Sequence, residues 1–342
     1  MNITICGGGN LGHVCAGFLS AQEANSVSLL TTKPDEWSKS IDVIDYKGNV
    51  YHGCFKSISS SPDEVIPQAE MVLICLPGYA IGNVLESIAP YLKPSCWVGT
   101  VVSSTGFFFE AFKHLRKDQP LFGFQRVPFI SRITQYGRKA ELKGYKESLS
   151  VAVEQIDDKE AIRSKLEELF KTPVVLLDSH YEVSLSNSNP LLHTSRLYTM
   201  WKDWKPGMSY EHNPGFYSEW TIEASELYIA MDEEFQQLLK KLRVREGSIP
   251  SVLKYYESWD ADSLTRKICS IPAFQGIASP MILNKDGKYQ PDFSSRYFTE
   301  DFLSGLKLIY DKSREKGIDI PYIERVYHWG IGMLRNASVI IE

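Results

Sequence analysis

The feature that most constrains the fold is a glycine-rich run near the N-terminus, which reads CGGGNLGH over residues 6–13. A short apolar-leaning segment precedes the run, and Leu11, Val14, Phe18 and Leu19 then recur at helical spacing. This order predicts a strand over residues 2–6, a tight turn and a helix. A G-x-G-x-x-G sequence between a strand and a helix is typical of a dinucleotide-binding turn.

Each glycine of the run has a physical task in such a turn. Gly7 permits the tight turn, Gly9 removes the Cβ that would keep the backbone from a pyrophosphate, and Gly12 lets the helix lie close to the sheet. The N–H groups at the helix N-terminus then face the phosphates. A glycine-rich turn without a ligand is the alternative, but the flanking elements favour a dinucleotide. We therefore expect the cofactor to contact Gly7, Gly9, Asn10, Leu11 and Gly12.

Length and composition indicate two domains and small-molecule partners. The chain of 342 residues is too long for one compact core, and its formal net charge of -5 gives no basic face for nucleic acid. No apolar run is long enough to cross a bilayer and no signal peptide is evident, so we expect a cytoplasmic protein. The 6 cysteines lack C-x-x-C spacing, which favours buried, reduced thiols over a metal site or disulfides. A homo-oligomer is possible, and the sequence does not specify the oligomeric state.

Strand and helix signals alternate through the first half of the chain, which predicts a Rossmann-type α/β dinucleotide-binding domain over residues 1–180. Residues 71–76 form the continuous apolar run of a buried parallel strand, and residues 47–49 mark the turn of an inserted hairpin. An amphipathic helix carries Ile162, Leu166 and Leu169. Further strands are expected over residues 27–31, 97–102, 121–124, 149–153 and 174–177.

Longer helical stretches predict a mainly α-helical second domain over residues 181–342. Pro190, Pro214, Pro250 and Pro321 each precede a helical pattern, at a position where a missing N–H costs little. We expect one long helix over residues 215–243. Because no long flexible linker is evident, the two domains should abut and leave a cleft.

The end of the second predicted strand bears on the choice of nucleotide. An Asp or Glu there would bind the adenosine ribose and select NAD. The chain instead has Thr31, Thr32 and Lys33, whose hydroxyls and positive charge suit a 2′-phosphate. NADP(H) is therefore favoured over NAD(H), although Asp35 or Glu36 reaching back would favour NAD(H).

A second cofactor contact is expected at Leu76, Pro77 and Gly78, which end a central strand. Ligands of open α/β sheets lie at the carboxyl ends of the strands, so these residues should border the nicotinamide ribose. A simple strand-to-helix turn is an equal alternative.

Two distant segments carry groups for acid–base chemistry. In the first, residues 186–198, Asn189 and Pro190 signal a helix start that places His193 in the first turn. The helix dipole favours a neutral imidazole there, and such a group can exchange a proton with a developing alkoxide or amine. A capping or core histidine is the alternative.

In the second segment, residues 291–302, Arg296 is suited to clamp a carboxylate, and Asp301 is suited to orient an imidazole. Ordinary helix chemistry is the alternative, with Thr299 as N-cap and Glu300 and Asp301 as acids of the first turn. The pattern alone favours this alternative.

The chain resembles the opine (octopine/nopaline) dehydrogenase family in residues 6–13, 122–128, 189–198 and 295–301, which fall in that family's order. The resemblance implies a nucleotide-binding domain joined to a helical opine domain. It also implies reductive condensation of an amino acid's amine with a 2-oxo acid by NADH or NADPH. His193 matches the family's catalytic histidine, Asp301 its acidic partner and Arg296 its arginine. Thr194 is a departure, because the family often has Pro there.

Within that scheme His193 shuttles a proton and Asp301 fixes its tautomer while an imine forms and is reduced. Arg296 is the first candidate for the oxo acid's carboxylate, and Arg126 and Arg132 are lesser ones.

The amino-acid pocket is expected among aromatic side chains beyond the catalytic histidine, namely Tyr198, Trp201 and Trp204. Core packing explains the same residues equally well.

Two other functions stay open. A reductase of the ketopantoate or glycerol-phosphate dehydrogenase type shares the first domain but has a catalytic Lys in the second, for which Lys202 and Lys254 are only loose candidates. Reduction of a 2-oxo acid without any amine would indicate that class. A non-catalytic NAD(P)H sensor would oxidise no cofactor with any amino acid.

Overall fold

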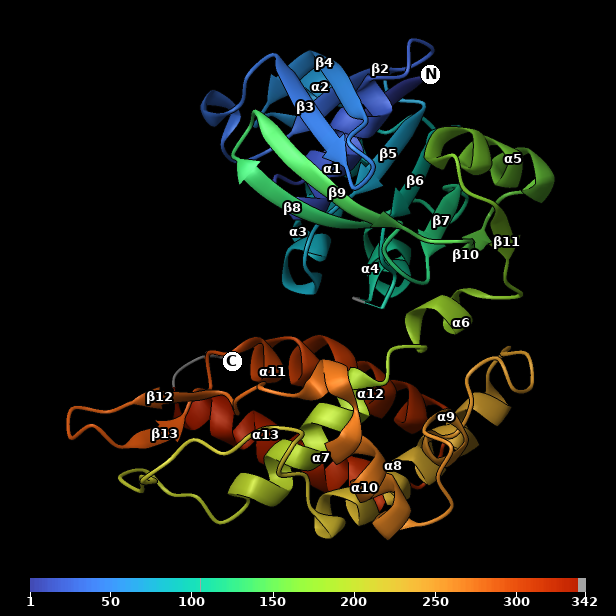
Figure 1. Cartoon of the computed structure of the whole chain (residues 1–342). Helices are drawn as coiled ribbons and strands as arrows, with labels where there is room; N and C mark the ends of the chain where they lie inside the picture. Colours follow the sequence, from blue (N-terminus) through green and yellow to red (C-terminus); the bar gives the residue numbers. More distant parts are fainter. Residues whose placement is uncertain (105, 338–342) are drawn as a thin grey trace. The chain divides into compact units, whose positions relative to one another are not determined.

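The computed structural model describes residues 1–104 and 106–337, and the chain divides into two compact units. Unit 1 comprises residues 1–186 and unit 2 comprises residues 187–342. Figure 1 shows that the large sheet belongs to unit 1 and that unit 2 is mainly helical. The predicted fold class, a Rossmann-type α/β domain followed by a helical one, is confirmed.

Unit 1 is built on one 11-stranded sheet, in the order β11-β10-β7-β6-β5-β1-β2-β4-β3-β9-β8. Its strands are Asn2–Cys6 (β1), Ser26–Leu30 (β2), Ser40–Asp45 (β3), Val50–Ser59 (β4), Met71–Ile74 (β5), Trp97–Thr100 (β6), Leu121–Phe124 (β7), Phe129–Gln135 (β8), Lys139–Tyr145 (β9), Leu149–Glu154 (β10) and Val174–Leu176 (β11). The central strands β2, β1, β5, β6 and β7 run parallel. Cys6 lies beside Leu30 and Ile74, so the ends of β1, β2 and β5 share one edge of the sheet.

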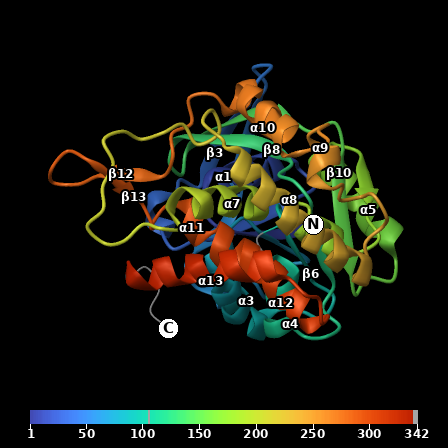
Figure 2. The same ribbon diagram turned by 90° about the horizontal axis from the view of Figure 1, so that it is seen from below.

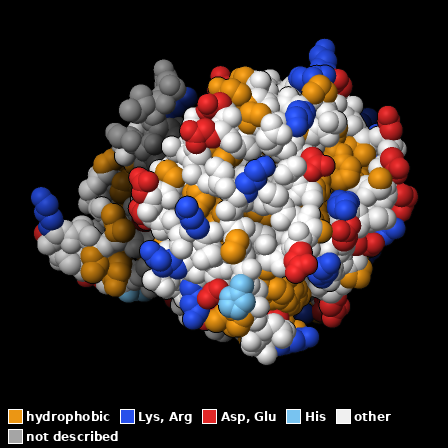
Figure 3. Space-filling view, turned by 90° about the horizontal axis from the view of Figure 1, so that it is seen from above, with side chains coloured by type: hydrophobic (Ala, Val, Ile, Leu, Met, Phe, Trp, Pro, Cys, Tyr) orange, Lys and Arg blue, Asp and Glu red, His pale blue; other side chains and the backbone are white. Residues whose placement is uncertain are grey.

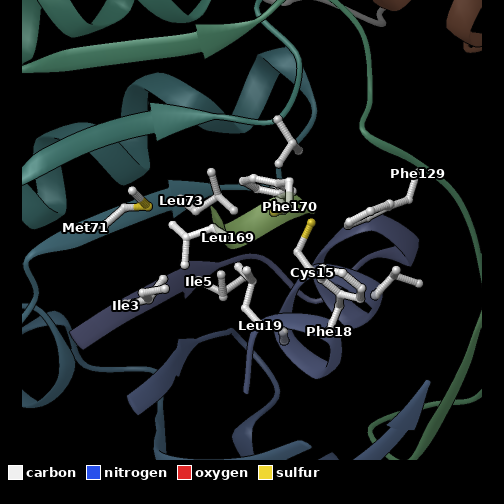
Figure 4. Close-up of a cluster of buried hydrophobic side chains, with 14 of the residues drawn as sticks. Ile3, Ile5, Cys15, Phe18, Leu19, Met71, Leu73, Phe129, Leu169 and Phe170 are labelled. Carbon is white, nitrogen blue, oxygen red and sulfur yellow. The ribbon is translucent and has the colours of Figure 1, made fainter. Parts of the chain in front are cut away.

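The central strands are apolar throughout because both of their faces are buried. In β5, Met71 and Leu73 join one buried cluster, whereas Val72 and Ile74 join a second cluster. Figure 4 shows the first cluster, where side chains of β1 and β5 meet those of α1 and α5. The helices of unit 1 are Asn10–Ser20 (α1), Pro62–Val65 (α2), Gly78–Ile88 (α3), Phe107–His114 (α4), Lys159–Phe170 (α5) and His180–Ser184 (α6).

The hairpin expected around residues 47–49 is confirmed, since β3 and β4 pair in antiparallel register and Gly48 has a φ of 87°. A second hairpin, β8–β9, was not expected from the sequence. β9 pairs with β3 in parallel, which extends the sheet by two strands beyond the inserted hairpin. Its turn passes through Gly137, whose φ of 65° suits glycine.

Three helices and a π-helical segment pack on one another in unit 2: α7, α8, α13 and η4 (Figure 2). The elements of unit 2 are Asn189–Trp201 (α7), Ile222–Lys241 (α8), Val252–Tyr255 (α9), Ala261–Ser270 (α10), Met281–Leu283 (β12), Tyr289–Pro291 (β13), Arg296–Thr299 (α11), Asp301–Leu306 (η4), Lys307–Glu315 (α12) and Pro321–Asn336 (α13). η4 has i+5 geometry, which is rare and is found mostly at functional sites.

The long helix expected over residues 215–243 is wrong in its first part. α8 begins at Ile222 because the Thr221 hydroxyl caps it, accepting the Ala224 N–H at 3.2 Å. Gly215 forms an isolated bridge with Ala278 instead, and the Phe216 N–H donates to the Ile277 carbonyl at 2.8 Å. Residues 216–219 then form a turn, in which the Trp220 N–H donates to the Tyr217 carbonyl at 3.1 Å, so Pro214 precedes a bridge and a turn rather than a helix.

Figure 3 shows one face of the molecule, on which Lys and Arg side chains are interspersed with Asp and Glu. No helix in the part of the chain that the structure describes is long and apolar enough to span a membrane. Cys6, Cys15, Cys75 and Cys96 are buried as expected, whereas Cys54 on β4 is exposed.

Candidate active site

The turn between β1 and α1 can only be made with glycines. Gly7 has a φ of 120°, and a Cβ at this position would lie 2.6 Å from the Cys75 carbonyl oxygen. A Cβ on Gly12 would collide with the Gly7 carbonyl oxygen. Any side chain at either position would push α1 away from the sheet, so the tasks predicted for these two glycines agree with the geometry.

The start of α1 is suited to hold a pyrophosphate. A Cβ built on Gly9 would find no neighbouring atom within 4 Å, so the backbone there faces open space. The first helical hydrogen bond runs from the His13 N–H to the Gly9 carbonyl at 3.0 Å. The N–H groups of Asn10 and Leu11 therefore have no acceptor within the helix and can donate to an anion.

Two neighbouring strand ends flank this turn. A Cβ on Gly7 would lie 2.9 Å from Leu76 Cδ2, and one on Gly8 would lie 3.1 Å from Thr31 Oγ1. Pro77 and Gly78 follow as the N-cap and first residue of α3. The structure thus brings the ends of β2 and β5, both predicted to contact the cofactor, to the same turn.

The residues expected to choose between NAD(H) and NADP(H) differ in exposure. Thr31 is buried, whereas Thr32 and Lys33 are exposed. Lys33 Nζ lies 3.0 Å from Glu36 Oε1. Glu36, one of the two acids that would favour NAD(H), is therefore engaged with Lys33.

A buried histidine, to which sequence reasoning assigned no role, ties the turn to the β8–β9 hairpin. The Gly9 carbonyl accepts a hydrogen bond from His13 Nδ1 at 3.0 Å, and Nε2 accepts the Gly137 N–H at 2.8 Å. The ring stacks on Trp37 at 4.0 Å and meets the edge of Tyr136 at 4.8 Å. Burial lowers the pKa of His13, so the imidazole is neutral and has one tautomer.

Asn10 also joins the turn to this hairpin, because its side-chain oxygen accepts the Ile133 N–H at 2.8 Å. The Asn10 side-chain oxygen is therefore used by β8, and its backbone N–H and Nδ2 amide are the donors left for the predicted cofactor contact.

In unit 2 the structure brings together His193 and Asp301, which are 108 residues apart in the chain. His193 Nδ1 lies 2.7 Å from Asp301 Oδ2, and the two side chains are 10% and 14% exposed. A carboxylate accepts, so Nδ1 carries the proton and Nε2 is left as the exchangeable nitrogen. His193 is the fifth residue of α7, just beyond the first turn in which the sequence placed it.

Close packing of η4 on α7 sets this distance. A Cβ on Gly305 would lie 2.5 Å from Pro190 Cγ, so only glycine lets η4 approach the first turn of α7. The Gly305 N–H donates to the Glu300 carbonyl at 3.0 Å, which is the i+5 bond of a π-helix. Thr299 is not the expected N-cap, because its hydroxyl donates to the Ser295 carbonyl at 3.2 Å inside the preceding turn.

Aromatic side chains enclose the His193 imidazole. The Tyr217 hydroxyl lies 2.7 Å from Nε2, and the Tyr297 ring lies 4.6 Å from the imidazole centroid. Tyr297 is also an electrostatic neighbour of Tyr217 and contributes to the raised pKa of that phenol. Phe216 packs against both His193 and Tyr297, at 5.7 Å and 4.8 Å. Burial raises the pKa of Tyr217, so its hydroxyl keeps its proton near neutral pH.

Arg196 holds the segment that carries Tyr217. Its Nε donates to the Phe216 carbonyl at 3.2 Å and its Nη2 to the Glu219 carbonyl at 2.6 Å. The guanidinium also lies over the Trp220 ring, at 5.8 Å from the centroid. Burial lowers the pKa of Arg196 to about 10, which still leaves it charged at neutral pH. Arg196 lies one helical turn after His193. α7 therefore positions His193 directly and positions Tyr217 through the hydrogen bonds of Arg196.

Of the predicted carboxylate-binding arginines, Arg296 borders this cluster, since its charge interacts with Asp301 and Tyr297. Arg296 is 83% exposed and its Nη2 lies 2.8 Å from Glu300 Oε2. Arg126 Nη2 donates to the Ser186 carbonyl at 2.9 Å, and Arg132 Nη1 to the carbonyl of Ser131 at 3.0 Å. All three are exposed, and their roles stay predictions.

The predicted aromatic pocket divides into separate environments. Trp201 is 2% exposed and its ring centroid lies 6.1 Å from that of Phe298, which favours the core-packing alternative, and its contact with the substrate stays a prediction. Tyr198 lines a different cavity of about 370 Å³ beside α8 and α13. Trp204 packs edge-on against Phe293 at 5.1 Å.

The two lysines considered for a ketopantoate-type reductase do not have the surroundings of a catalytic acid. Lys202 Nζ lies 2.6 Å from Glu223 Oε1, and Lys254 is exposed on α9. Within residues 1–104 and 106–337, neither lysine forms a hydrogen bond or ion pair with His193 or Asp301.

Two family models match this chain, one in each half. Residues 176–334 match "NAD/NADP octopine/nopaline dehydrogenase, alpha-helical domain", and residues 3–124 match "Ketopantoate reductase PanE/ApbA". The second match covers only the nucleotide-binding half, which the two enzyme classes share in fold.

Characterised relatives and solved structures extend over nearly the whole chain. The opine dehydrogenase of Haliotis discus hannai is 26% identical over 364 residues, covering 96% of this chain and 89% of that protein. The tauropine dehydrogenase of Arabella iricolor is 28% identical over 360 residues, covering 96% and 90%. A structure of octopine dehydrogenase with NADH and L-arginine aligns with a TM-score of 0.84 and 22% identity, covering 98% and 89%. Residues 176–334 therefore match the helical domain of the opine (octopine/nopaline) dehydrogenase family, and the chain is similar to members of that family over nearly its whole length.

Proposed function

We propose that the protein catalyses the NAD(P)H-dependent reductive condensation of an amino acid's amine with a 2-oxo acid. The pairing of His193 with Asp301 at 2.7 Å, within the helical domain that the family model matches, carries the proposal. Relatives named opine and tauropine dehydrogenase support it. The amino acid and the oxo acid are not specified by these residues.

His193 and Asp301 supply the acid–base chemistry that an imine requires. Neutral His193 takes a proton from the substrate ammonium, and the freed amine attacks the oxo carbon to give a carbinolamine. The imidazolium then returns the proton to the carbinolamine hydroxyl, the C–O bond breaks, water leaves and a C=N bond forms. Asp301 stabilises the transient imidazolium by its negative charge on Nδ1–H.

The β1–α1 turn and the ends of β2 and β5 would hold the cofactor. Gly7, Gly9 and Gly12 shape the turn, and Leu76 lies beside it. When bound, the reduced nicotinamide supplies the hydride that the imine carbon receives. The carboxylate of the oxo acid needs a cation, and we propose Arg296 for this role. Arg296 would then release Glu300, to which its Nη2 donates, and donate to the substrate carboxylate instead.

NADPH is proposed as the preferred cofactor because Thr31, Thr32 and Lys33 end β2 where an acid would select NAD. The ratio of kcat/KM for NADPH to that for NADH should exceed one. In Lys33→Ala this ratio should fall about tenfold, the effect of one charge-assisted hydrogen bond. Lys39→Ala, another exposed lysine after β2, is the matched control. A ratio that stays the same in Lys33→Ala would remove Lys33 from cofactor selection.

The function is tested with a matrix of amino acids against pyruvate, glyoxylate and 2-oxoglutarate, followed by oxidation of NADPH and NADH. Wild-type protein should oxidise cofactor only when both substrates are present. His193→Ala should lose this oxidation and still bind NADPH, because the nucleotide site lies in unit 1. Unchanged amine-dependent oxidation by His193→Ala would contradict the proposed role of His193.

A further inference from the structure

Both ring nitrogens of His193 already have protein partners. Asp301 Oδ2 accepts from Nδ1 at 2.7 Å, and the Tyr217 hydroxyl lies 2.7 Å from Nε2. Because neutral His193 carries its proton on Nδ1, Nε2 accepts and Tyr217 donates. The Tyr217 oxygen then keeps lone pairs that can accept a further hydrogen bond, on a phenol whose electrostatic neighbours include Tyr297. In this arrangement a proton reaches or leaves Nε2 only across the Tyr217 oxygen.

We propose that Tyr217 is a catalytic proton relay between His193 Nε2 and the reacting oxygen of the substrate. This inference rests on the proposed function, because it names the group through which the condensation exchanges its proton. In this proposal the substrate oxygen accepts the Tyr217 O–H proton while the Tyr217 oxygen accepts from protonated Nε2. Tyr297 is half-buried, in contrast to Tyr217, which is buried, so Tyr297 is the more accessible of the two residues.

The relay moves one proton in two linked transfers. Imidazolium Nε2–H gives its proton to the Tyr217 oxygen, while the Tyr217 O–H proton passes to the carbinolamine hydroxyl. The carbinolamine C–O bond then breaks, water leaves, and the nitrogen lone pair forms the C=N bond. Tyr217 ends protonated as it began and His193 ends neutral. The proton is the one that His193 took from the substrate ammonium, so no other reactant is required.

The fold holds the Tyr217 phenol in one position, as a relay requires. Its ring stacks on Phe274 with centroids 4.1 Å apart and an angle of 17°. Arg196 binds the carbonyls of Phe216 and Glu219 on either side of it. A phenol that only filled space beside His193 would not need a hydroxyl 2.7 Å from Nε2.

Tyr217→Phe tests the relay because it removes one hydroxyl and keeps the stacked ring. The expected result is a kcat lowered about 100-fold, with KM values for both substrates and the thermal midpoint close to wild type. Since proton transfer becomes slower, the solvent deuterium effect on kcat should rise. Tyr310→Phe, which removes a hydroxyl between α12 and α13, is the control and should keep wild-type kcat.

Tyr297→Phe tests the same relay with Tyr217 in place, and should lower kcat about tenfold by removing the hydroxyl of an electrostatic neighbour of that phenol. A near wild-type kcat in Tyr217→Phe overturns the relay. A loss of kcat that is accompanied by unfolding, or by an unchanged solvent deuterium effect, also overturns the relay. Either result would indicate that Tyr217 has a structural role. If wild-type protein shows no amine-dependent oxidation, the proposed function fails and the relay fails with it.

Discussion

At the scale of single residues, the chemistry depends on what faces each nitrogen of His193. The sequence suggests His193 and Asp301 as the acid–base pair, because the two segments that contain them resemble segments of the opine dehydrogenase family. It does not suggest Tyr217, which lies in a turn before α8 with no periodicity and reaches Nε2 through tertiary packing. Arg196 stands in the same helix-start segment as His193, yet its two carbonyl acceptors are 20 and 23 residues away. Sequence spacing cannot show such contacts.

Asp301→Asn should lower kcat about 100-fold and leave the binding of NADPH unchanged. The amide keeps the shape of the carboxylate but has no charge to stabilise the imidazolium. Steady-state kinetics with the best substrate pair and a separate NADPH titration measure the two effects. Asp311→Asn, which removes an exposed carboxylate of α12, is the control. Equal kcat in both variants would show that Asp301 has no part in proton transfer.

Arg196→Lys should lower the free energy of unfolding by about 2 kcal/mol. An ammonium cannot reach both carbonyls with the planar geometry of a guanidinium, so one buried acceptor loses its donor. The kcat should fall as well, because the Tyr217 segment is less well held. Urea denaturation measures the first effect. Arg266→Lys, in an exposed pair with Asp262, should change stability little, and a similar small change in Arg196→Lys would refute the clamp.

At the scale of helices and strands, prediction succeeds where local pattern and tertiary structure agree. β5 is expected because a strand buried on both faces must be apolar throughout, and its residues divide between two clusters. α8 starts seven residues later than expected, because the Thr221 cap and the pairing of Phe216 with Ile277 outweigh helical periodicity. The β8–β9 hairpin is missed, because residue type does not follow burial in β8, where Ser131 is buried and Ile130 is exposed.

The His13 contact predicts a pH dependence of stability that belongs to the β1–α1 turn and its hairpin. Burial lowers the pKa of His13 below the value of about 6.5 that it has in the unfolded chain. The unfolded chain therefore binds a proton more readily, and stability is lost as pH falls below about 6.5 towards the folded pKa. Protonated Nε2 could also no longer accept the Gly137 N–H.

Thermal unfolding between about pH 7.5 and pH 5.5 measures this loss. His13→Gln should be less stable than wild type at the upper pH and should lose less stability on acidification. His212→Gln, which replaces an exposed histidine of unit 2, should keep the wild-type slope. A wild-type slope in His13→Gln would show that this contact does not govern acid sensitivity.

At the scale of the whole molecule, unit 1 and unit 2 provide different kinds of evidence about the reaction. Unit 1 has the dinucleotide turn but resembles ketopantoate reductases over residues 3–124, so it does not by itself decide the reaction. Unit 2 decides it, because the His193–Asp301 pair and the family's helical domain both lie there. The alternative functions therefore differ in the residues that they require in unit 2. A ketopantoate-type reductase requires a catalytic Lys there, whereas a non-catalytic NAD(P)H sensor requires no catalytic residue.

In the proposed reaction a carbonyl and an amine are joined before reduction. To test this order, wild-type protein is incubated with NADPH, a 2-oxo acid and a ¹⁵N-labelled amino acid, and the product is identified by mass spectrometry and NMR. Cofactor oxidation should require the amino acid, and the label should appear in a secondary amine carrying the reduced oxo-acid carbon. Oxidation without the amino acid, with a 2-hydroxy acid as product, would contradict the proposed reaction.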